Sequence, residues 1–284
     1  MFPCIIKIFL IICPIITSLR IRPTMSSPTR NYAFLGAKDQ ASYFNTCLRI
    51  AVESSKNCLQ DDKKYIEIEF PPNRKSDLSV TETLDTNRAF VREFAKAWKE
   101  YNRDLWVVFP DANEANLAKT TQGWGTSVPF TITSINAAVE APEEYSPKLI
   151  IAVNPGFNVE EWIALPALER RECPIIVING SLDRLRNGYY PRIFYPGLYK
   201  ASQQYYSKFT QAVFLSPIAI DGNRFGGWLT RLYPGLWDVL VRDTVSKGTY
   251  TVISSSERTP NPTDTWKLAK KEMSKRTGGG TSLF

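Results

Sequence analysis

The residue types that the sequence lacks set the first limit on its chemistry. Among its 284 residues there is no histidine, which excludes Ser-His-Asp and Cys-His nucleophiles, histidine metal ligands and histidine acid/base catalysis. No Gly-x-x-x-x-Gly-Lys-Ser/Thr segment is present, so a P-loop is excluded. Catalysis by carboxylates or lysine stays open, because these residues are plentiful and their spacing does not show which of them meet across strands.

The cysteines and glycines give no sign of a cofactor or a metal. Beyond the first 38 residues the cysteines are Cys47, Cys58 and Cys173, too few and too scattered for a zinc or iron–sulfur site. Gly123-Trp124-Gly125 is the nearest approach to a dinucleotide-binding loop, but it follows a predicted helix and precedes a predicted strand, the reverse of the required order. We therefore expect neither a cofactor nor a metal ion.

Three polar residues at the ends of predicted strands are the candidates for a ligand crevice. Asp111, Asn154 and Asn179 each follow or close an apolar run. In a doubly wound sheet the carboxyl ends of the strands share one edge, and ligands bind there. Asp and Asn also cap helices and turns when no ligand is present. From the sequence, both interpretations stay open.

The most distinctive segment is the aromatic stretch Gly226–Val239. Within it, Tyr233-Pro234-Gly235 predicts a tight turn between two strands, because proline fixes one φ and glycine can adopt a positive φ. Arg231, Tyr233 and Trp237 are candidates for binding a partner, since Tyr, Trp and Arg dominate interface hot spots. Of these, Arg231 and Trp237 are expected to be the most accessible. The alternative is structural, because aromatic cross-strand pairs stabilise a hairpin.

The basic excess of the chain belongs mainly to its N-terminus. The formal net charge is +7, but the residues from Met1 to Lys38 hold five basic side chains and no acidic one. The remaining residues include 30 basic and 28 acidic side chains, so they have no general attraction for a polyanion. We expect no binding to nucleic acid.

The N-terminus has the two-part composition of a targeting leader. The apolar stretch Ile5–Ile16 is shorter than the roughly 20 residues that span a bilayer and is typical of a signal peptide. Thr17–Arg30 is rich in Ser, Thr and Arg and has no acid, as in a transit peptide. A signal followed by a transit peptide predicts a plastid protein. A secreted glycoprotein is another alternative, with a glycosylation sequon at Asn179.

Apolar runs that alternate with amphipathic stretches predict an α/β fold. Leu105–Phe109, Leu149–Val153 and Pro174–Asn179 are typical of strands covered on both faces, whereas the alternation in Tyr65–Phe70 indicates a strand with one wet face. Asp85–Tyr101 is the clearest helix, with one aromatic stripe. Strands that alternate with helices predict a three-layer, Rossmann-like, mostly parallel sheet.

The C-terminal part of the chain has a different pattern. Short apolar segments separated by Gly, Pro and Asn predict an antiparallel meander attached to the sheet. Its expected strands are Ala212–Ile220, Gly227–Tyr233, Trp237–Arg242 and Tyr250–Ser254. A final amphipathic helix is expected from Pro262 to about Lys275. We therefore divide the chain into a leader (1–38), a single α/β domain (39–275) and a flexible tail (276–284).

On these motifs the sequence resembles the plant and algal family catalogued as domain of unknown function 1995. The resemblance covers roughly Gln40–Met273. The motifs that carry it are Glu67–Pro72, Phe109-Pro110-Asp111, Asn154-Pro155-Gly156, Asn179, Tyr206–Thr210 and Gly227–Val239. The last is the most specific and is similar to the family's G-A-L-F-R-x-Y-P-G-P-W-Q-V. This chain has Leu236 and Asp238 where the family commonly has Pro and Gln.

The resemblance implies a role but no active site. The family includes the chloroplast low photosystem II accumulation assembly factor, and it supplies no catalytic residues to transfer. We therefore expect a non-enzymatic plastid protein of the stroma or thylakoid surface that binds photosystem subunits or thylakoid-associated proteins. We expect no transmembrane helix in the mature protein and leave peripheral membrane contact open. The alternative is a small-molecule or nucleotide-linked α/β enzyme that uses the crevice.

Overall fold

The computed structural model describes residues 32–72, 79–121, 124, 129–156, 158–220, 224–243, 246 and 248–278. Most of the expected leader (1–31), two glycines of the candidate glycine loop (Gly123 and Gly125) and the end of the expected tail (279–284) lie outside these residues.

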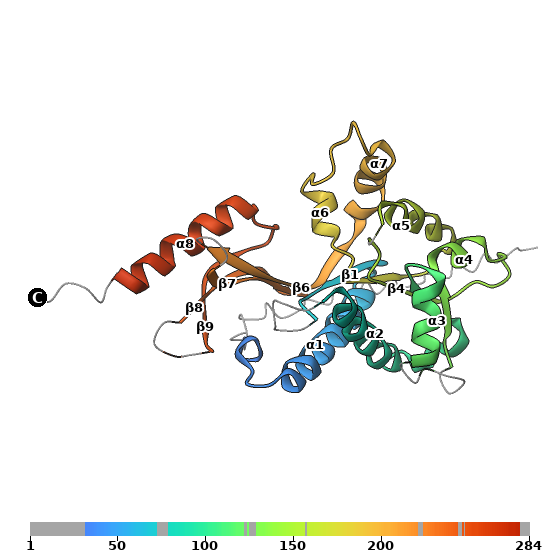
Figure 1. The fold of residues 1–284 in the computed structure, drawn as a ribbon, viewed down its shortest axis with the longest axis horizontal. Coiled ribbons are helices and arrows are strands. Elements are labelled where there is room, and N and C mark those ends of the chain that lie inside the picture. Colours follow the sequence, from blue (N-terminus) through green and yellow to red (C-terminus); the bar gives the residue numbers. More distant parts are fainter. Residues whose placement is uncertain are drawn as a thin grey trace, which may run out of the picture. The chain divides into compact units, whose positions relative to one another are not determined.

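One sheet runs through the described residues, with nine strands in the order β3-β2-β4-β5-β1-β6-β7-β8-β9 (Figure 1). Pairing is parallel from β3 to β6 and antiparallel from β6 to β9. The strands are β1 (Tyr65–Glu69), β2 (Leu105–Phe109), β3 (Thr131–Ser134), β4 (Leu149–Val153), β5 (Ile175–Ile178), β6 (Thr210–Ile220), β7 (Arg224–Leu232), β8 (Trp237–Arg242) and β9 (Tyr250–Ser256). The predicted mostly parallel sheet with a C-terminal antiparallel meander is confirmed.

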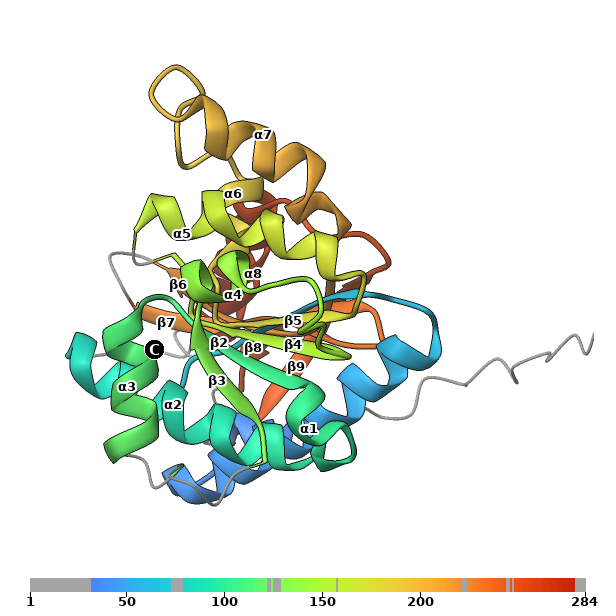
Figure 2. The same cartoon turned by 90° about the vertical axis from the view of Figure 1, so that its right-hand side faces the viewer.

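Helices cover both faces of the parallel strands, as Figure 2 shows. One layer contains α1 (Gln40–Gln60), α2 (Val80–Lys96) and α3 (Ala112–Thr121); the other contains α4 (Ile135–Glu140), α5 (Val159–Ala164), α6 (Leu182–Arg186) and α7 (Pro196–Gln204). The predicted final helix, α8 (Pro262–Gly278), packs on the antiparallel strands. Short 3-10 turns complete the described chain: η1 (Ala33–Gly36), η2 (Lys99–Asp104), η3 (Leu165–Arg171) and η4 (Tyr206–Lys208).

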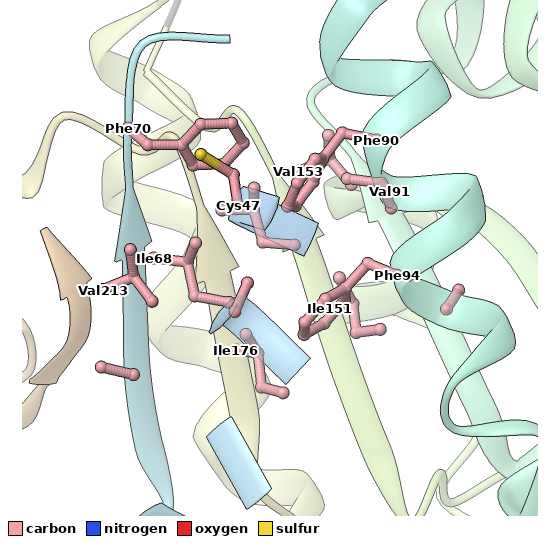
Figure 3. Close-up of a cluster of buried hydrophobic side chains, with 14 of the residues drawn as sticks. Cys47, Ile68, Phe70, Phe90, Val91, Phe94, Ile151, Val153, Ile176 and Val213 are labelled. Atoms are coloured by element: carbon pink, nitrogen blue, oxygen red, sulfur yellow. The ribbon is translucent and has the colours of Figure 1, made fainter. Parts of the chain in front are cut away.

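The apolar runs form strands that are buried on both faces. All residues of β2, β4 and β5 are buried, and alternate residues of β2 face different layers. Val107 packs in the cluster with α1 and α2, whereas Val108 packs in the cluster with α5 and α6. Figure 3 shows the first cluster, in which Phe90 of α2 lies near Val153 of β4 and Phe94 lies near Ile151. Large apolar side chains therefore join the sheet to each layer.

The boundaries of two helices differ from those expected. The predicted helix Asp85–Tyr101 begins earlier, at Val80, because Ser79 and Glu82 form a capping box. It ends at Lys96, and the chain then continues into η2. Helix α8 extends through the first residues of the expected tail to Gly278.

The folded domain begins upstream of Asp39, the start expected from the sequence. Leu35 is fully buried in the cluster with α1 and α2. The hydroxyl of Tyr32 donates a hydrogen bond to the buried carboxylate of Asp238 on β8, at 2.5 Å. The segment before α1 is therefore part of the core, and Asp238, one of the departures from the resembling family, has a structural role.

Candidate functional site

Two neighbouring strands of the sheet lead to helices on opposite faces. β1 leads to α2 in one layer, and β5 leads to α6 in the other. Sheets of this type form a crevice beyond the carboxyl ends of such strands. A cavity of about 280 Å³ lies there, and we call it the crevice. Its lining residues are Glu69, Phe70, Pro71, Pro72, Thr83, Asn87, Asn154, Asn179, Ser181, Asp183, Arg184, Phe214, Leu215, Ser216 and Pro217.

A chain of three asparagine side chains lines the crevice. Asn179 Nδ2 donates to Asn87 Oδ1 at 2.7 Å, and Asn87 Nδ2 donates to Asn154 Oδ1 at 3.1 Å. The backbone N–H of Phe70 donates to Asn179 Oδ1 at 2.9 Å. Asn154, Asn179 and Ser181 have positive φ values of 48°, 52° and 50°, a conformation that costs free energy in residues other than glycine. Hydrogen bonds from the protein's own groups therefore hold this wall in place.

Two glutamates of β1 lie next to α6. Arg186 Nη2 donates to both carboxylate oxygens of Glu67, at 2.8 and 2.7 Å, and Glu67 is fully buried. The backbone N–H of Ser181 donates to Glu69 Oε2 at 3.0 Å. Burial, together with the negative charges of Glu67 and Asp183, raises the pKa of Glu69 to about 8. The Glu69 carboxyl thus keeps its proton at neutral pH and lines the crevice.

The expectation that Tyr65–Phe70 has one wet face is wrong. β1 lies inside the sheet, between β5 and β6, and Glu67 on the supposedly wet face is covered and paired with Arg186. The alternation of glutamate with apolar residues reflects a buried ion pair here. This alternation in an otherwise apolar strand was also the feature of the sequence from which Glu69 could have been identified as a site residue.

The structure brings together two of the three predicted crevice residues. Asn154 and Asn179 both line the crevice and are joined through Asn87. Asp111 does not line it; the exposed side chain of Asp111 accepts the backbone N–H of Glu114 at 2.9 Å and caps α3. Asn87 was not predicted as a site residue. The one feature of the sequence that points to it is its place, as a polar residue, near the aromatic stripe of α2.

The predicted partner-binding residues are engaged within the fold. Trp237 is 1% exposed, so the expectation that it is accessible is wrong; α8 and the neighbouring strands cover it. Arg231 is half-buried, and its guanidinium lies 5.9 Å from the ring of Tyr233 and 5.7 Å from that of Trp237. The hydroxyl of Tyr233 donates to Asp61 Oδ2 at the end of α1, at 2.7 Å. The Tyr233–Asp61 hydrogen bond ties the β7–β8 turn to the parallel half of the domain.

Other reactive groups lie away from the crevice. Burial raises the pKa of Cys47 and of Cys58 to about 12 and that of Cys173 to about 11, so all three remain thiols at neutral pH. Within the described ranges, no group of three cysteine, aspartate or glutamate side chains is arranged to hold a metal ion. In the same ranges, no helix has the length and apolar character needed to span a bilayer.

One of three comparisons with known proteins found a match. A family model described as "Domain of unknown function (DUF1995)" matches residues 42–266, a range that includes the whole crevice and the β7–β8 turn. Searches of curated proteins and of solved structures found no match.

Proposed function

The chain belongs to the DUF1995 family, and from that premise we propose that it is a non-enzymatic plastid auxiliary protein that binds protein partners. We place its action at the stroma or thylakoid surface, in the assembly or stability of a photosystem. The observation that supports binding is the crevice, where polar side chains are already fixed by hydrogen bonds to one another. In this proposal a segment of the partner inserts into the crevice.

The crevice has the properties of a pocket for an anchoring side chain. Its volume is about 280 Å³, and Phe70, Pro71, Pro72 and Phe214 give it apolar walls. Side chains that fill such pockets contribute most of the free energy of protein–protein binding. Because the asparagine wall is already ordered, little conformational entropy is lost when a partner hydrogen-bonds to it.

The proposed plastid location and the proposed photosystem partner do not rest on the crevice. The plastid location is supported by the acid-free, hydroxyl-rich composition of the N-terminal 38 residues. The choice of photosystem subunits is supported by the resemblance of Gly227–Val239 to the motif of a family that includes a photosystem assembly factor.

A variant that fills the crevice tests the binding role. Thr83 lines the crevice from α2 and is half-buried, so Thr83→Trp places a large ring in the cavity without removing any of the three asparagines. Thr81→Trp is the matched control, because Thr81 is exposed on the same helix and does not line the crevice. Each tagged protein is purified from solubilised plastids, and the photosystem subunits that accompany it are quantified.

We expect the natural protein and Thr81→Trp to recover photosystem subunits equally, and Thr83→Trp to recover at least about tenfold less, as expected for loss of an anchoring contact. Circular dichroism must show that both variants are folded. Equal recovery by folded Thr83→Trp would contradict binding through the crevice, and recovery of no photosystem subunit by the natural protein would contradict the choice of partner.

A second candidate is an enzyme that acts on a small molecule in the crevice. Its specific support is Glu69, whose pKa of about 8 suits proton transfer near neutral pH. Native mass spectrometry of protein isolated from plastids would show a bound small molecule. If that molecule is altered by the natural protein and left unchanged by Glu69→Gln, the enzyme proposal replaces the first.

A further inference from the structure

The connection between α6 and α7 exposes a cluster of large apolar side chains. Ile193 and Phe194 are adjacent and are 88% and 75% exposed, the two highest values among the exposed large hydrophobic residues of the described chain. Tyr189, Tyr199 and Tyr195 are 69%, 42% and 36% exposed. We call these five residues the α6–α7 tip. Single exposed apolar residues are common on protein surfaces, but a cluster of this kind indicates an interaction site.

The tip stands on a packed base. The ring of Tyr190 lies 5.4 Å from that of the buried Trp162, and the ring of Tyr195 lies 5.3 Å from that of Tyr190. The backbone N–H groups of Phe194 and Tyr195 both donate to the carbonyl of Pro191 at 3.1 Å, which closes a turn. In both Figure 1 and Figure 2 the α6–α7 connection projects beyond the neighbouring helices. The packed tyrosines and the turn at Pro191 therefore hold the α6–α7 tip so that it projects into solvent.

The segment around the tip is positively charged. From Arg184 to Ile220 the sequence has five basic residues and no acidic one. Arg186 pairs with Glu67 and Lys208 with Glu169, so the charge beside the tip comes from Arg192 and Lys200. Arg192 and Lys200 are exposed, and the guanidinium of Arg192 lies 5.0 Å from the ring of Tyr199. The acid that precedes this segment, Asp183, lines the crevice. The tip thus combines apolar extremities with a cationic flank.

We propose that the α6–α7 tip docks the domain directly onto an anionic lipid bilayer, with Ile193 and Phe194 inserted below the headgroups. The tyrosines and Arg192 then lie at headgroup level, where aromatic rings and basic side chains are stabilised. A projecting pair of adjacent apolar residues suits insertion into lipid, and the exposed basic side chains beside it suit an anionic headgroup layer. This surface is separate from the crevice, so the inference goes beyond the proposed function.

Vesicle sedimentation tests the inference with the full chain. The vesicles contain either phosphatidylcholine alone or phosphatidylcholine mixed with the anionic lipid phosphatidylglycerol. The test variant is Ile193→Ser/Phe194→Ser. The matched control is Tyr145→Ser, which removes a residue that is 63% exposed on another part of the surface. All proteins share the apolar N-terminal stretch, so differences between them report on the tip.

We expect the natural protein and Tyr145→Ser to bind the anionic vesicles equally, and the double variant to bind at least about tenfold more weakly, because two apolar side chains no longer leave water. Added salt should weaken the binding of the natural protein. The inference is overturned if the folded double variant binds as well as the natural protein, or if phosphatidylcholine alone is bound equally well. It is also overturned if the tip binds no vesicles and instead captures a purified plastid protein. None of these results bears on Thr83→Trp, so the proposed function is tested separately.

Discussion

Glu69 is held where burial and the negative charges of Glu67 and Asp183 oppose its ionisation. Its pKa is raised from 4.5 to about 8, so the folded protein keeps a proton that the unfolded chain releases. The stability that this proton contributes is complete below about pH 4.5 and is lost as pH rises toward about 8. We therefore expect the melting temperature of the natural protein to fall across this range, and that of Glu69→Gln to fall less.

Thermal melts at a series of pH values check this prediction. The basic groups near Glu69 are Arg184 and Arg186 on α6. Burial also raises the pKa of the neighbouring Glu67, but Glu67 is present in both proteins, so the difference between them reports on Glu69. Glu257→Gln, at an exposed position, is the control and should keep the pH dependence of the natural protein. Parallel melting profiles for Glu69→Gln and the natural protein would show that Glu69 ionises freely in the fold.

The individual site residues were predictable only where local sequence determines position. Asn154 and Asn179 were identified because each follows an apolar strand, and parallel strands align their carboxyl ends. Asn87 joins them from α2, across sequence separations of 67 and 92 residues, and no local pattern encodes such a contact. The accessibility expected for Trp237 failed for a similar reason, since α8 covers that face of β8 from a distant part of the chain.

At the scale of elements, the close pairing of β7 with β8 depends on Gly227. A Cβ atom at this position would lie 1.8 Å from the carbonyl oxygen of Leu240, so the strands would have to separate. We expect Gly227→Ala to lower the free energy of unfolding by about 3 kcal/mol, as overpacking of a core does. Gly197→Ala on α7 is the control, because its Cβ would meet only Ile163 Cδ1 at 3.7 Å. Denaturant unfolding that shows equal losses for the two variants would contradict the close approach.

The strands were easier to predict than their arrangement. Continuous apolar runs identified β2, β4 and β5, and short segments between turn residues identified β6 to β9. The neighbours of β1 could not be predicted, because its pairing with β5 and β6 joins residues more than 100 positions apart. The turn at Tyr233-Pro234-Gly235 was expected to use a positive φ at Gly235; instead the Tyr233–Pro234 bond is cis, and Gly235 is not among the described residues with positive φ.

At the scale of the whole domain, α6 links the two proposed sites. Its first turn contributes Asp183 and Arg184 to the crevice, its last residue Arg186 pairs with Glu67, and the tip follows directly. A tip docked on a bilayer would therefore hold the crevice near the membrane surface. This arrangement suits a protein whose partners are membrane proteins, as the proposed function requires.

The packing of the N-terminal segment limits where the proposed targeting leader could be removed. Leu35 is fully buried, and Tyr32 donates its hydroxyl hydrogen bond to Asp238, which also accepts from the hydroxyl of Ser255 at 2.6 Å. Cleavage as late as Asp39, which the sequence alone allowed, would remove Leu35 and leave the buried Asp238 without one of its partners.

We therefore expect the mature chain to begin between about Thr17 and Tyr32, the upstream limit being set by the hydroxyl-rich segment. N-terminal sequencing of protein isolated from plastids checks this position, and a mature terminus beyond Tyr32 would contradict it. A protein that starts at Tyr32 should also be more stable than one that starts at Asp39, by about 1.5–3 kcal/mol for the burial of Leu35 alone. If the two proteins unfold at the same denaturant concentration, the segment Tyr32–Gly36 does not stabilise the domain, and the position of cleavage is not restricted by the fold.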